Sequence, residues 1–502
     1  MIEATTPLER VRPEACGVRS EGIQAFVEAV AHDPVRLHSL MLLRHGKVVA
    51  EGWWKPFRPD HKRYLYSLSK SFTATAVGLA ISDGLLGIDD RVVSFFPDDL
   101  PATISDNLAA MRVCDLLTMT TGHATDTTPA LFTPGLVNWV QAILALPVDH
   151  APGTHFVYNS GATYLLSAIV QGRTGRTLLD YLSERLMAPL GIVDATWDAC
   201  PRGIHVGGWG LSITTEAIAR FGQFCLQRGL WNGKQLVPAS WIDAATSAQV
   251  PNNGVDRQNE PIDWQQGYGY QFWRCRHNAY RGDGAFGQYC IVMPDKDAVL
   301  AITSESPDMQ IVLDRVWAHI LPALTDDDRL SQGAAATELA ETLVALHLET
   351  HAPQAVPAIR PSRLSQTFVL EPNMTGLRSI RLEADGDSYC LRVQDEFEEH
   401  AVHCGLGEWI QNESRMPLLL PTMMQLGHFG TYAKPIPLAA SAAWTAADTL
   451  TLTWQYLEAP HRSAMTCLFG PEGVSLELAH SVLDPNSPFY AARELRFTGR
   501  PA

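Results

Sequence analysis

Residues 66–79 read YSLSKSFTATAVGL, and the interpretation of the whole chain starts from this stretch. Apolar residues recur at the three- and four-residue spacing of an α-helix, and Val77 and Ile81 add a second apolar face. A helix that is apolar almost all round is usually buried. Gly84 follows, and glycine is a common residue at the end of a helix. The pattern therefore predicts a core helix whose first turn contains Ser67.

Ser67 and Lys70 have the spacing S-x-x-K, which places both side chains on one face of the helix. A serine hydroxyl is a weak nucleophile until a base removes its proton, and a lysine in a desolvated site can have its pKa lowered enough to be that base. The positive potential at a helix N-terminus favours the neutral amine and stabilises an oxyanion. The alternative interpretation is a helix cap followed by a surface lysine. We favour the catalytic pair, because a lysine inside an otherwise apolar helix needs a reason to be there.

The composition limits the classes of protein. The chain has 502 residues, of which 46% are hydrophobic and 18% are charged, as expected for a globular protein of two or three domains. A formal net charge of −16 makes nucleic acid and anionic membranes poor partners, and no stretch is long and apolar enough to span a bilayer. The first residues do not resemble a secretory signal, and nine scattered cysteines without C-x-x-C fit reduced thiols. We therefore expect a cytoplasmic protein.

Strand-like and helix-like segments are mixed in the first 330 residues. Residues 40–52 read as a β-hairpin around His45 and Gly46, and residues 290–293 and 298–303 read as two further strands. The clearest helical segments are 113–122, 136–146, 161–174, 178–186 and 311–324. These elements predict one domain over residues 1–330.

The character of the chain changes near residue 325. An alanine-rich helix is predicted over residues 333–348, and several prolines follow between residues 353 and 361. Short strands separated by turns come next, at 367–370, 379–382, 389–393, 450–456, 464–469, 474–478 and 495–498. We therefore predict a helical linker over residues 331–355 and an antiparallel β domain, a barrel or a sandwich, over residues 356–502.

Two further motifs follow the S-x-x-K pair in order: Tyr158-Asn159-Ser160 and Gly282-Asp283-Gly284. With them, residues 20–325 resemble the serine β-lactamase-like hydrolases, and in particular the branch with class C β-lactamases, penicillin-binding proteins and carboxylesterases. That branch also contains DD-peptidases, D-aminopeptidases and nylon-oligomer hydrolases. The resemblance implies an α+β, β-lactamase/transpeptidase-like domain, with an antiparallel sheet flanked by helices, a helical subdomain, and a site where they meet.

The resemblance also implies roles for particular residues. Ser67 would form an acyl-enzyme, Lys70 would take its proton, and Tyr158 would assist proton transfer. A lysine ammonium beside the phenol is expected to lower the pKa of Tyr158. The backbone N–H groups of Ser67 and Ala285 would form the oxyanion hole. Taken alone, Tyr158 could equally be a buried aromatic residue between two subdomains.

The second and third motifs depart from the pattern of the family. Asparagine commonly ends the second motif, but here Ser160 ends it and Asn159 stands in the middle. Lysine or histidine commonly begins the third motif, but here Gly282 stands there. We expect Asn159, Ser160, Gly282, Asp283 and Gly284 to contact the substrate, and these departures bear on the substrate class more than on the acyl-enzyme mechanism.

These observations favour a serine hydrolase of carboxylesterase type that cleaves a small-molecule ester, amide or peptide. A D-amino-acid peptidase or amidase and a β-lactamase are alternatives, and a non-catalytic ligand-binding or sensory module is an alternative of another class. An α/β-hydrolase would need a G-x-S-x-G motif, which the chain lacks. His123 could be a general base, but a histidine just after a predicted helix end is more often structural. We expect no cofactor and no metal, because histidines and cysteines do not cluster at ligand spacing.

Overall fold

The computed structural model describes residues 7–254, 257–327, 329–331, 333–352, 364–373, 376–415, 435–481 and 495–502. The chain divides into two compact units. The first consists of Met1–Trp53 and Lys62–Leu346, and the second of Trp54–His61 and His347–Ala502. The boundaries predicted at residues 330 and 356 stay a prediction.

The first unit contains a six-stranded antiparallel sheet with the strand order β2-β1-β11-β10-β9-β8. The strands are β1 (Arg36–Arg44), β2 (Lys47–Trp53), β8 (Trp273–Arg274), β9 (Tyr280–Gly284), β10 (Gln288–Met293) and β11 (Ala298–Glu305). The hairpin predicted at residues 40–52 is β1 and β2, and His45 has a left-handed backbone at its turn. Strands β9, β10 and β11 are buried along their whole length, so both faces of the sheet are covered.

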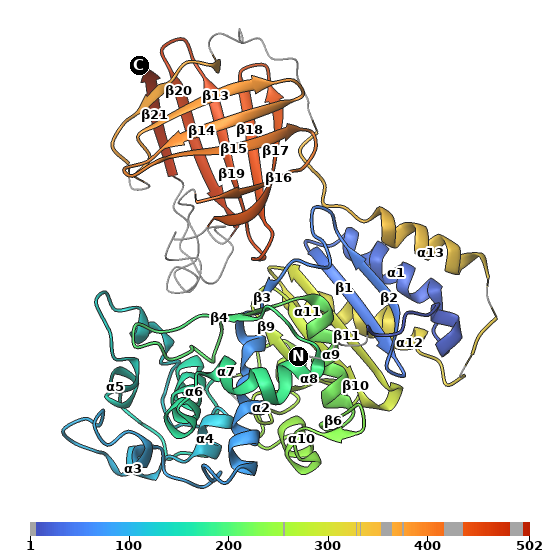
Figure 1. Ribbon diagram of the computed structural model, residues 1–502, viewed down its shortest axis with the longest axis vertical. Coiled ribbons are helices and arrows are strands. Elements are labelled where there is room, and N and C mark those ends of the chain that lie inside the picture. The colour runs from blue at the N-terminus through green and yellow to red at the C-terminus, as the bar shows by residue number, and fades with distance from the viewer. Residues whose placement is uncertain are drawn as a thin grey trace. The chain divides into compact units, whose positions relative to one another are not determined.

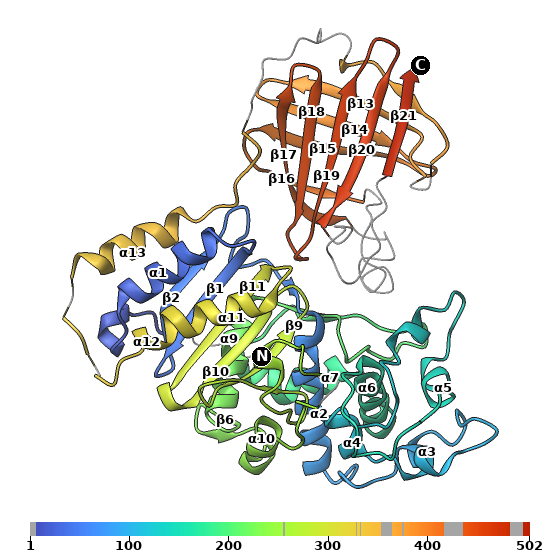
Figure 2. The same ribbon diagram turned by 180° about the vertical axis from the view of Figure 1, so that it is seen from behind.

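Helices cover the two faces of this sheet (Figures 1 and 2). One group of helices comes from the two ends of the first unit's sequence and packs together. It consists of α1 (Ser20–Ala31), α11 (Met309–Arg315), α12 (Leu321–Ala323) and α13 (Ala334–Ala345). Helix α9 (Thr215–Leu226) packs against β1, β10 and β11, where Gly222 leaves room for Val299 and Cys290. The helix predicted at residues 311–324 is interrupted by the π-helical turn η9 (Val316–Ile320).

The remaining helices form the helical part of the unit around α2 (Ser69–Ser82). They are α3 (Asp106–Ala110), α4 (Val113–Leu117), α5 (Trp139–Leu144), α6 (Ser160–Thr174), α7 (Leu178–Leu182), α8 (Ala188–Leu190) and α10 (Ala239–Thr246). Two small sheets join them, one of β3 (Arg63–Tyr64), β5 (Leu211–Ile213) and β4 (Thr196–Trp197), the other of β6 (Leu230–Trp231) and β7 (Lys234–Gln235). Among the described residues, no helix combines the length and apolar character that crossing a membrane requires.

Helix α2 is the core helix predicted from the sequence. All of its residues from Ser69 to Ala80 are buried, and it packs against α6, α7 and β9. Its hydroxyl side chains are satisfied inside the core, since Thr73 donates to the Gly207 carbonyl and Thr75 to the Ser71 carbonyl. These internal bonds remove the cost of burying polar groups, so the helix can be enclosed on every side.

The second unit is a closed β-barrel whose strand pairs are antiparallel except for one, which confirms the predicted β domain. Its strands are β12 (Phe368–Leu370), β13 (Ser379–Asp385), β14 (Ser388–Gln394), β15 (Glu399–Leu406), β16 (Ile410–Ser414), β17 (Ile436–Ala446), β18 (Thr449–Tyr456), β19 (Arg462–Phe469), β20 (Val474–His480) and β21 (Leu495–Pro501). Strands β15 and β17 pair in parallel and close the ring, and β16 adds to β17. Alternate side chains of β19 and β20 are buried, as expected for a period of two, whereas β18 is buried at every position after Thr449.

Candidate active site

Ser67 lies on a sharp turn in front of α2. The short 3₁₀ helix η2 (Tyr66–Leu68) carries it, and its side chain is partly exposed. Tyr66 has a φ of 48°, a left-handed backbone that is uncommon for a residue with a bulky side chain. The ring of Tyr66 packs edge-on against Tyr64 and Phe286, with centroids 4.9 and 5.4 Å away. The aromatic packing holds the turn that presents the serine.

Lys70 is buried one turn further along and reaches back to Ser67. Its Nζ donates to Ser67 Oγ at 2.9 Å, to Ser160 Oγ at 2.9 Å and to the Gly208 carbonyl at 2.8 Å. Burial lowers the pKa of Lys70 to about 7, although Asp126 and Asp283 act in the opposite direction. A lysine with this pKa is largely neutral in mildly basic solution and can accept a proton.

Tyr158 completes a cluster with Ser67 and Lys70. Its hydroxyl is hydrogen-bonded to Ser67, and Lys70 Nζ lies 4.7 Å from the centre of its ring. The ring stacks on Trp273 with centroids 5.1 Å apart. Burial and the nearby charge of Asp283 raise the pKa of Tyr158. The prediction that its pKa is lowered is therefore wrong, because desolvation and the Asp283 charge outweigh the hydrogen bond with Ser67 and the charge of Arg281, and the phenol keeps its proton.

The second motif divides its residues between the site and the core. Ser160 Oγ accepts a hydrogen bond from Lys70, so the last residue of the motif does face the candidate catalytic cluster. The buried Asn159 caps α6 instead: its Oδ1 accepts from Ala162 N at 3.3 Å and from Thr127 Oγ1 at 2.7 Å. The Oδ1 of Asn159 is thus occupied by helix capping, and the substrate contact of this residue stays a prediction.

The third motif lies on β9, beside η2. A side chain at Gly282 would collide with Leu68 and Ser71, and one at Gly284 would collide with the Leu65 carbonyl oxygen. Both glycines thus allow the strand to approach the turn that carries the nucleophile. Ala285 follows in the turn after β9, where its carbonyl accepts from Gln288 Nε2 at 3.2 Å. The oxyanion-hole role of its N–H stays a prediction.

Asp283 points to the other face of β9 and is buried. Its Oδ2 accepts from Arg281 Nε at 2.8 Å, and the Trp273 indole also donates to the carboxylate. Burial raises the pKa of Asp283, and Arg281 opposes this rise. The carboxylate of the third motif is therefore paired inside the protein, and the substrate contact predicted for Asp283 stays a prediction.

Asp126 is the residue of the site that the sequence motifs did not indicate. Its Oδ1 accepts from the Ser160 backbone N at 3.1 Å and from Thr128 Oγ1 at 2.6 Å, and its charge acts on Lys70. It lies in an irregular threonine-rich loop, where no spacing distinguishes it. His123 is structural: Nδ1 pairs with Thr121 Oγ1 at 2.9 Å, and burial lowers its pKa.

The described residues contain no group of three or more histidine, cysteine, aspartate or glutamate side chains that could hold a metal ion. Ser67 and the buried Lys70 lie at the start of the core helix α2, and Tyr158, which precedes α6, lies beside them. The beta-lactamase family matches residues 26–320. The chain therefore belongs to the beta-lactamase family, which confirms the resemblance seen in the sequence.

The chain is also similar in sequence to two enzymes and in fold to a solved structure. The 6-aminohexanoate-dimer hydrolase of Paenarthrobacter ureafaciens is 26% identical over 325 residues, which cover 61% of this chain and 81% of that enzyme. The D-aminopeptidase of Brucella canis is 27% identical over 188 residues, only 34% of this chain and 35% of that enzyme. The octameric penicillin-binding protein homologue from Pyrococcus abyssi shares the fold, with a TM-score of 0.50, 15% identity, and coverage of 95% of this chain and 99% of that chain.

Proposed function

We propose that this protein is a serine hydrolase that cleaves a small carboxylic ester or amide through an acyl-enzyme on Ser67. The observation that carries the proposal is the buried Lys70, whose Nζ lies 2.9 Å from Ser67 Oγ and whose pKa is lowered to about 7. A base close to the nucleophile, with a pKa near the working pH, is what general-base catalysis requires.

The reaction would proceed in two halves. In the first, neutral Lys70 accepts the proton of Ser67 as Oγ attacks the carbonyl carbon, and the N–H groups of Ser67 and Ala285 stabilise the oxyanion. Tyr158, which keeps its proton, gives it to the departing alcohol or amine and is reprotonated by Lys70. In the second half, water attacks the acyl-enzyme and gives its proton to the same pair, so that Ser67 is released with its hydroxyl restored.

Substitution of the nucleophile tests this proposal. Ser67→Ala should abolish hydrolysis of p-nitrophenyl butyrate and the covalent adduct with a fluorescent phosphonate. Ser82→Ala is the matched control, because Ser82 is an exposed serine at the far end of the same helix. Undiminished hydrolysis by the folded Ser67→Ala protein would refute the assignment. Absence of both turnover and adduct in the unaltered protein would favour a non-catalytic binding module.

Amide cleavage is the second candidate, and the names of the relatives favour it. One relative is named a 6-aminohexanoate-dimer hydrolase and another a D-aminopeptidase. An amine must be protonated to leave, whereas the anion of an acidic alcohol can leave without a proton. The raised pKa of Tyr158 keeps a proton available for an amine leaving group. Turnover of the 6-aminohexanoate dimer at a kcat/KM above that of the butyrate ester would make the protein an amidase first.

We also propose a cytoplasmic location, supported by the cysteines. All nine are free thiols, and eight of them are buried. Free buried thiols are typical of proteins that work in a reducing compartment. Fractionation of cells that make the full-length natural protein would test this, and recovery from the periplasm or medium would contradict it.

A further inference from the structure

A buried ion pair on β9 lies behind the catalytic cluster. Arg281 and Asp283 are two residues apart on one face of the strand, and their contact is the 2.8 Å bond from Nε to Oδ2. The Asp283 carboxylate also accepts the indole N–H of Trp273, whose ring stacks on Tyr158. Asp283 is thus one side chain away from Tyr158, and its charge also acts on Lys70.

Arg281 is fixed by its surroundings. It is completely buried, its Nη1 donates to the Asp263 carbonyl at 2.7 Å and to Cys275 Sγ at 3.0 Å, and its guanidinium lies 4.2 Å from the centre of the Trp264 ring. Releasing it would leave Asp283 buried and unpaired, which is costly. The Arg281 side chain therefore does not rotate out of the core to reach a substrate, and it pairs with Asp283 instead.

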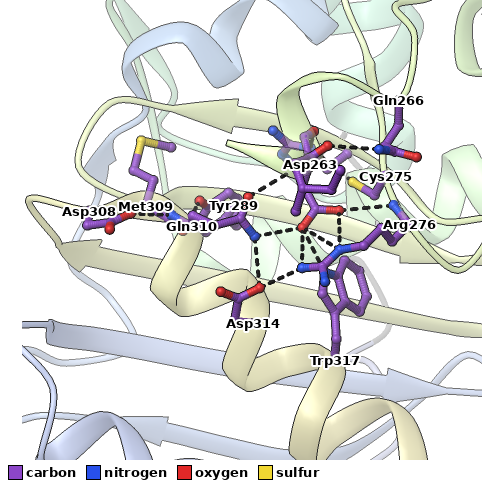
Figure 3. A network of polar contacts seen from close by, with 12 residues as sticks. Asp263, Gln266, Cys275, Arg276, Tyr289, Asp308, Met309, Gln310, Asp314 and Trp317 are labelled. Atoms are coloured by element: carbon purple, nitrogen blue, oxygen red, sulfur yellow. Dashed lines mark hydrogen bonds and ion pairs between the residues drawn. The ribbon is translucent and has the colours of Figure 1, made fainter. Parts of the chain in front are cut away.

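The Arg281 side chain is joined through the Asp263 carbonyl to a network of polar contacts around the Asp263 carboxylate, which Figure 3 shows. The Asp263 carboxylate accepts from Arg276 Nη2 at 2.8 Å, Gln310 Nε2 at 2.7 Å and Trp317 Nε1 at 3.0 Å. Burial opposes its ionisation, but these hydrogen bonds lower the pKa of Asp263 to about 2. The carboxylate thus ties η7 (Ile262–Trp264) to α11 and η9, and the carbonyl of the same residue receives Arg281.

We propose that Asp283 and Arg281 are positioning residues for the reaction. The Asp283 carboxylate acts on Lys70 through space and on Tyr158 through Trp273, and Arg281 keeps this carboxylate ionised and in place. This inference rests on the proposed function of Ser67 and Lys70. The proposal gives a role to the third motif. This motif has Gly282 where the family commonly has a lysine or histidine, and the residues on either side of Gly282 form a buried ion pair.

The charge on Asp283 has a definite effect on Lys70. The groups that face the amine are Ser67, Ser160, the Gly208 carbonyl and the ring of Tyr158, and the two carboxylates that act on it are Asp126 and Asp283. A negative charge favours the ammonium and so raises the pKa of the lysine. Since only the neutral amine is a base, removal of the Asp283 charge should make Lys70 competent at lower pH.

The kinetic test compares the pH dependence of kcat/KM for p-nitrophenyl butyrate. In Asp283→Asn, the midpoint of the acid limb should move to lower pH by roughly half a unit or more, less than the 1–3 units that a charge in direct contact produces. Asp314→Asn is the matched control, since Asp314 is exposed and pairs with Arg276 at the outer end of the same network. Asp283→Glu, which keeps the charge, should restore the original midpoint. An unmoved midpoint in Asp283→Asn, or an equal shift in Asp314→Asn, would overturn the inference.

Two additions make the test independent of folding and of turnover. Asp283→Asn could leave Arg281 unpaired and unfold the protein, so the double variant Arg281→Met/Asp283→Asn removes both charges together. It should shift the midpoint in the same direction but by less, because loss of the arginine charge partly opposes loss of the carboxylate. The chain has seven lysines, so the Lys70 side chain is assignable by ¹³C NMR with labelled lysine and a Lys70→Arg variant. A titration midpoint unchanged by the double variant would overturn the inference. Wild-type protein without turnover or phosphonate adduct would instead refute the proposed function.

Discussion

The lowered proton affinity of Lys70 predicts how activity and stability depend on pH. The pKa falls from 10.5 to about 7 because the side chain is enclosed, which corresponds to about 5 kcal/mol against the ammonium. At pH 6 only about a tenth of the molecules would hold a neutral Lys70, and at pH 8 about nine-tenths would. We therefore expect kcat/KM for p-nitrophenyl butyrate to rise about tenfold from pH 6 to pH 8, with a midpoint near 7.

The control for this profile is Lys70→Arg, which keeps a positive charge that cannot be removed in this range. It should lose turnover at every pH by a factor on the order of 10² to 10⁴. A wild-type midpoint above pH 9 would mean that the lysine is not desolvated. A Lys70→Arg protein that keeps the wild-type profile would mean that another group is the base.

Stability should depend on the same residue with a defined sign. The folded-state pKa lies below that of the unfolded chain, so the unfolded chain binds more protons between pH 7 and about 10.5. The cost of the buried ammonium is complete below pH 7 and disappears as pH rises through this window. Lys70→Met removes the charge, so its stability relative to wild type should be higher at pH 6 than at pH 9. Denaturant midpoints at the two pH values measure this, and an equal difference at both would refute the reasoning.

Four further outcomes follow from the same geometry. In Ser67→Ala/Lys70→Ala, turnover should be little lower than in either single variant, because members of one catalytic unit are not additive; losses that add on a logarithmic scale would contradict this. Gly284→Ala should destabilise the protein by about 1–3 kcal/mol in thermal denaturation and lower kcat/KM, whereas Gly172→Ala, where nothing lies within 4 Å of a new Cβ, should not. Nitrocefin should be hydrolysed with a lower kcat/KM than p-nitrophenyl butyrate by several-fold, because the buried arginine of β9 is held by its ion pair and offers no cation to the β-lactam carboxylate. A chain ended after residue 352 should keep a folded first unit with cooperative unfolding, since that unit ends at Leu346; an insoluble product would place the boundary elsewhere.

Features of the structure could be predicted from the sequence where the local residue pattern alone determines them. Helix α2 is apolar enough to be identified as a core helix, and its first turn places Lys70 beside Ser67. The order of the three motifs also predicted that Tyr158 would join them, and the structure brings these side chains together. Such features depend on residues a few positions apart or on a motif set that recurs in one fold.

Properties set by distant neighbours were predicted less well. The pKa of Tyr158 is raised because Trp273, Tyr268 and Asp283 surround it, and none of these is close to it in the sequence. The helix expected to reach residue 122 ends at Leu117, since Met119 takes a left-handed backbone with a φ of 60°. Desolvation and packing between distant residues cannot be predicted from a short stretch of sequence.

Three strands of the barrel, β15, β16 and β17, were also missed, and the sequences of β17 and β15 show why. Strand β17 reads IPLAASAAWTA, and alanine is depleted in strands, so its pattern does not indicate one. Strand β15 alternates exposed and buried side chains, but its buried positions include histidine and cysteine, which weaken the apolar alternation. In both cases, pairing with neighbouring strands decides the structure in place of intrinsic preference.

The short segment Trp54–His61 belongs to the second unit, although it interrupts the first. Its Lys55 forms an isolated bridge with His347, and the Leu348 N–H donates to the Lys55 carbonyl at 2.7 Å. During synthesis this segment is made roughly 290 residues before the rest of the second unit begins, so it cannot take its place in that unit until the later part of the chain has been made. The same segment ends six positions before the nucleophile. The chain therefore crosses from the second unit back into the first immediately before the turn that presents Ser67.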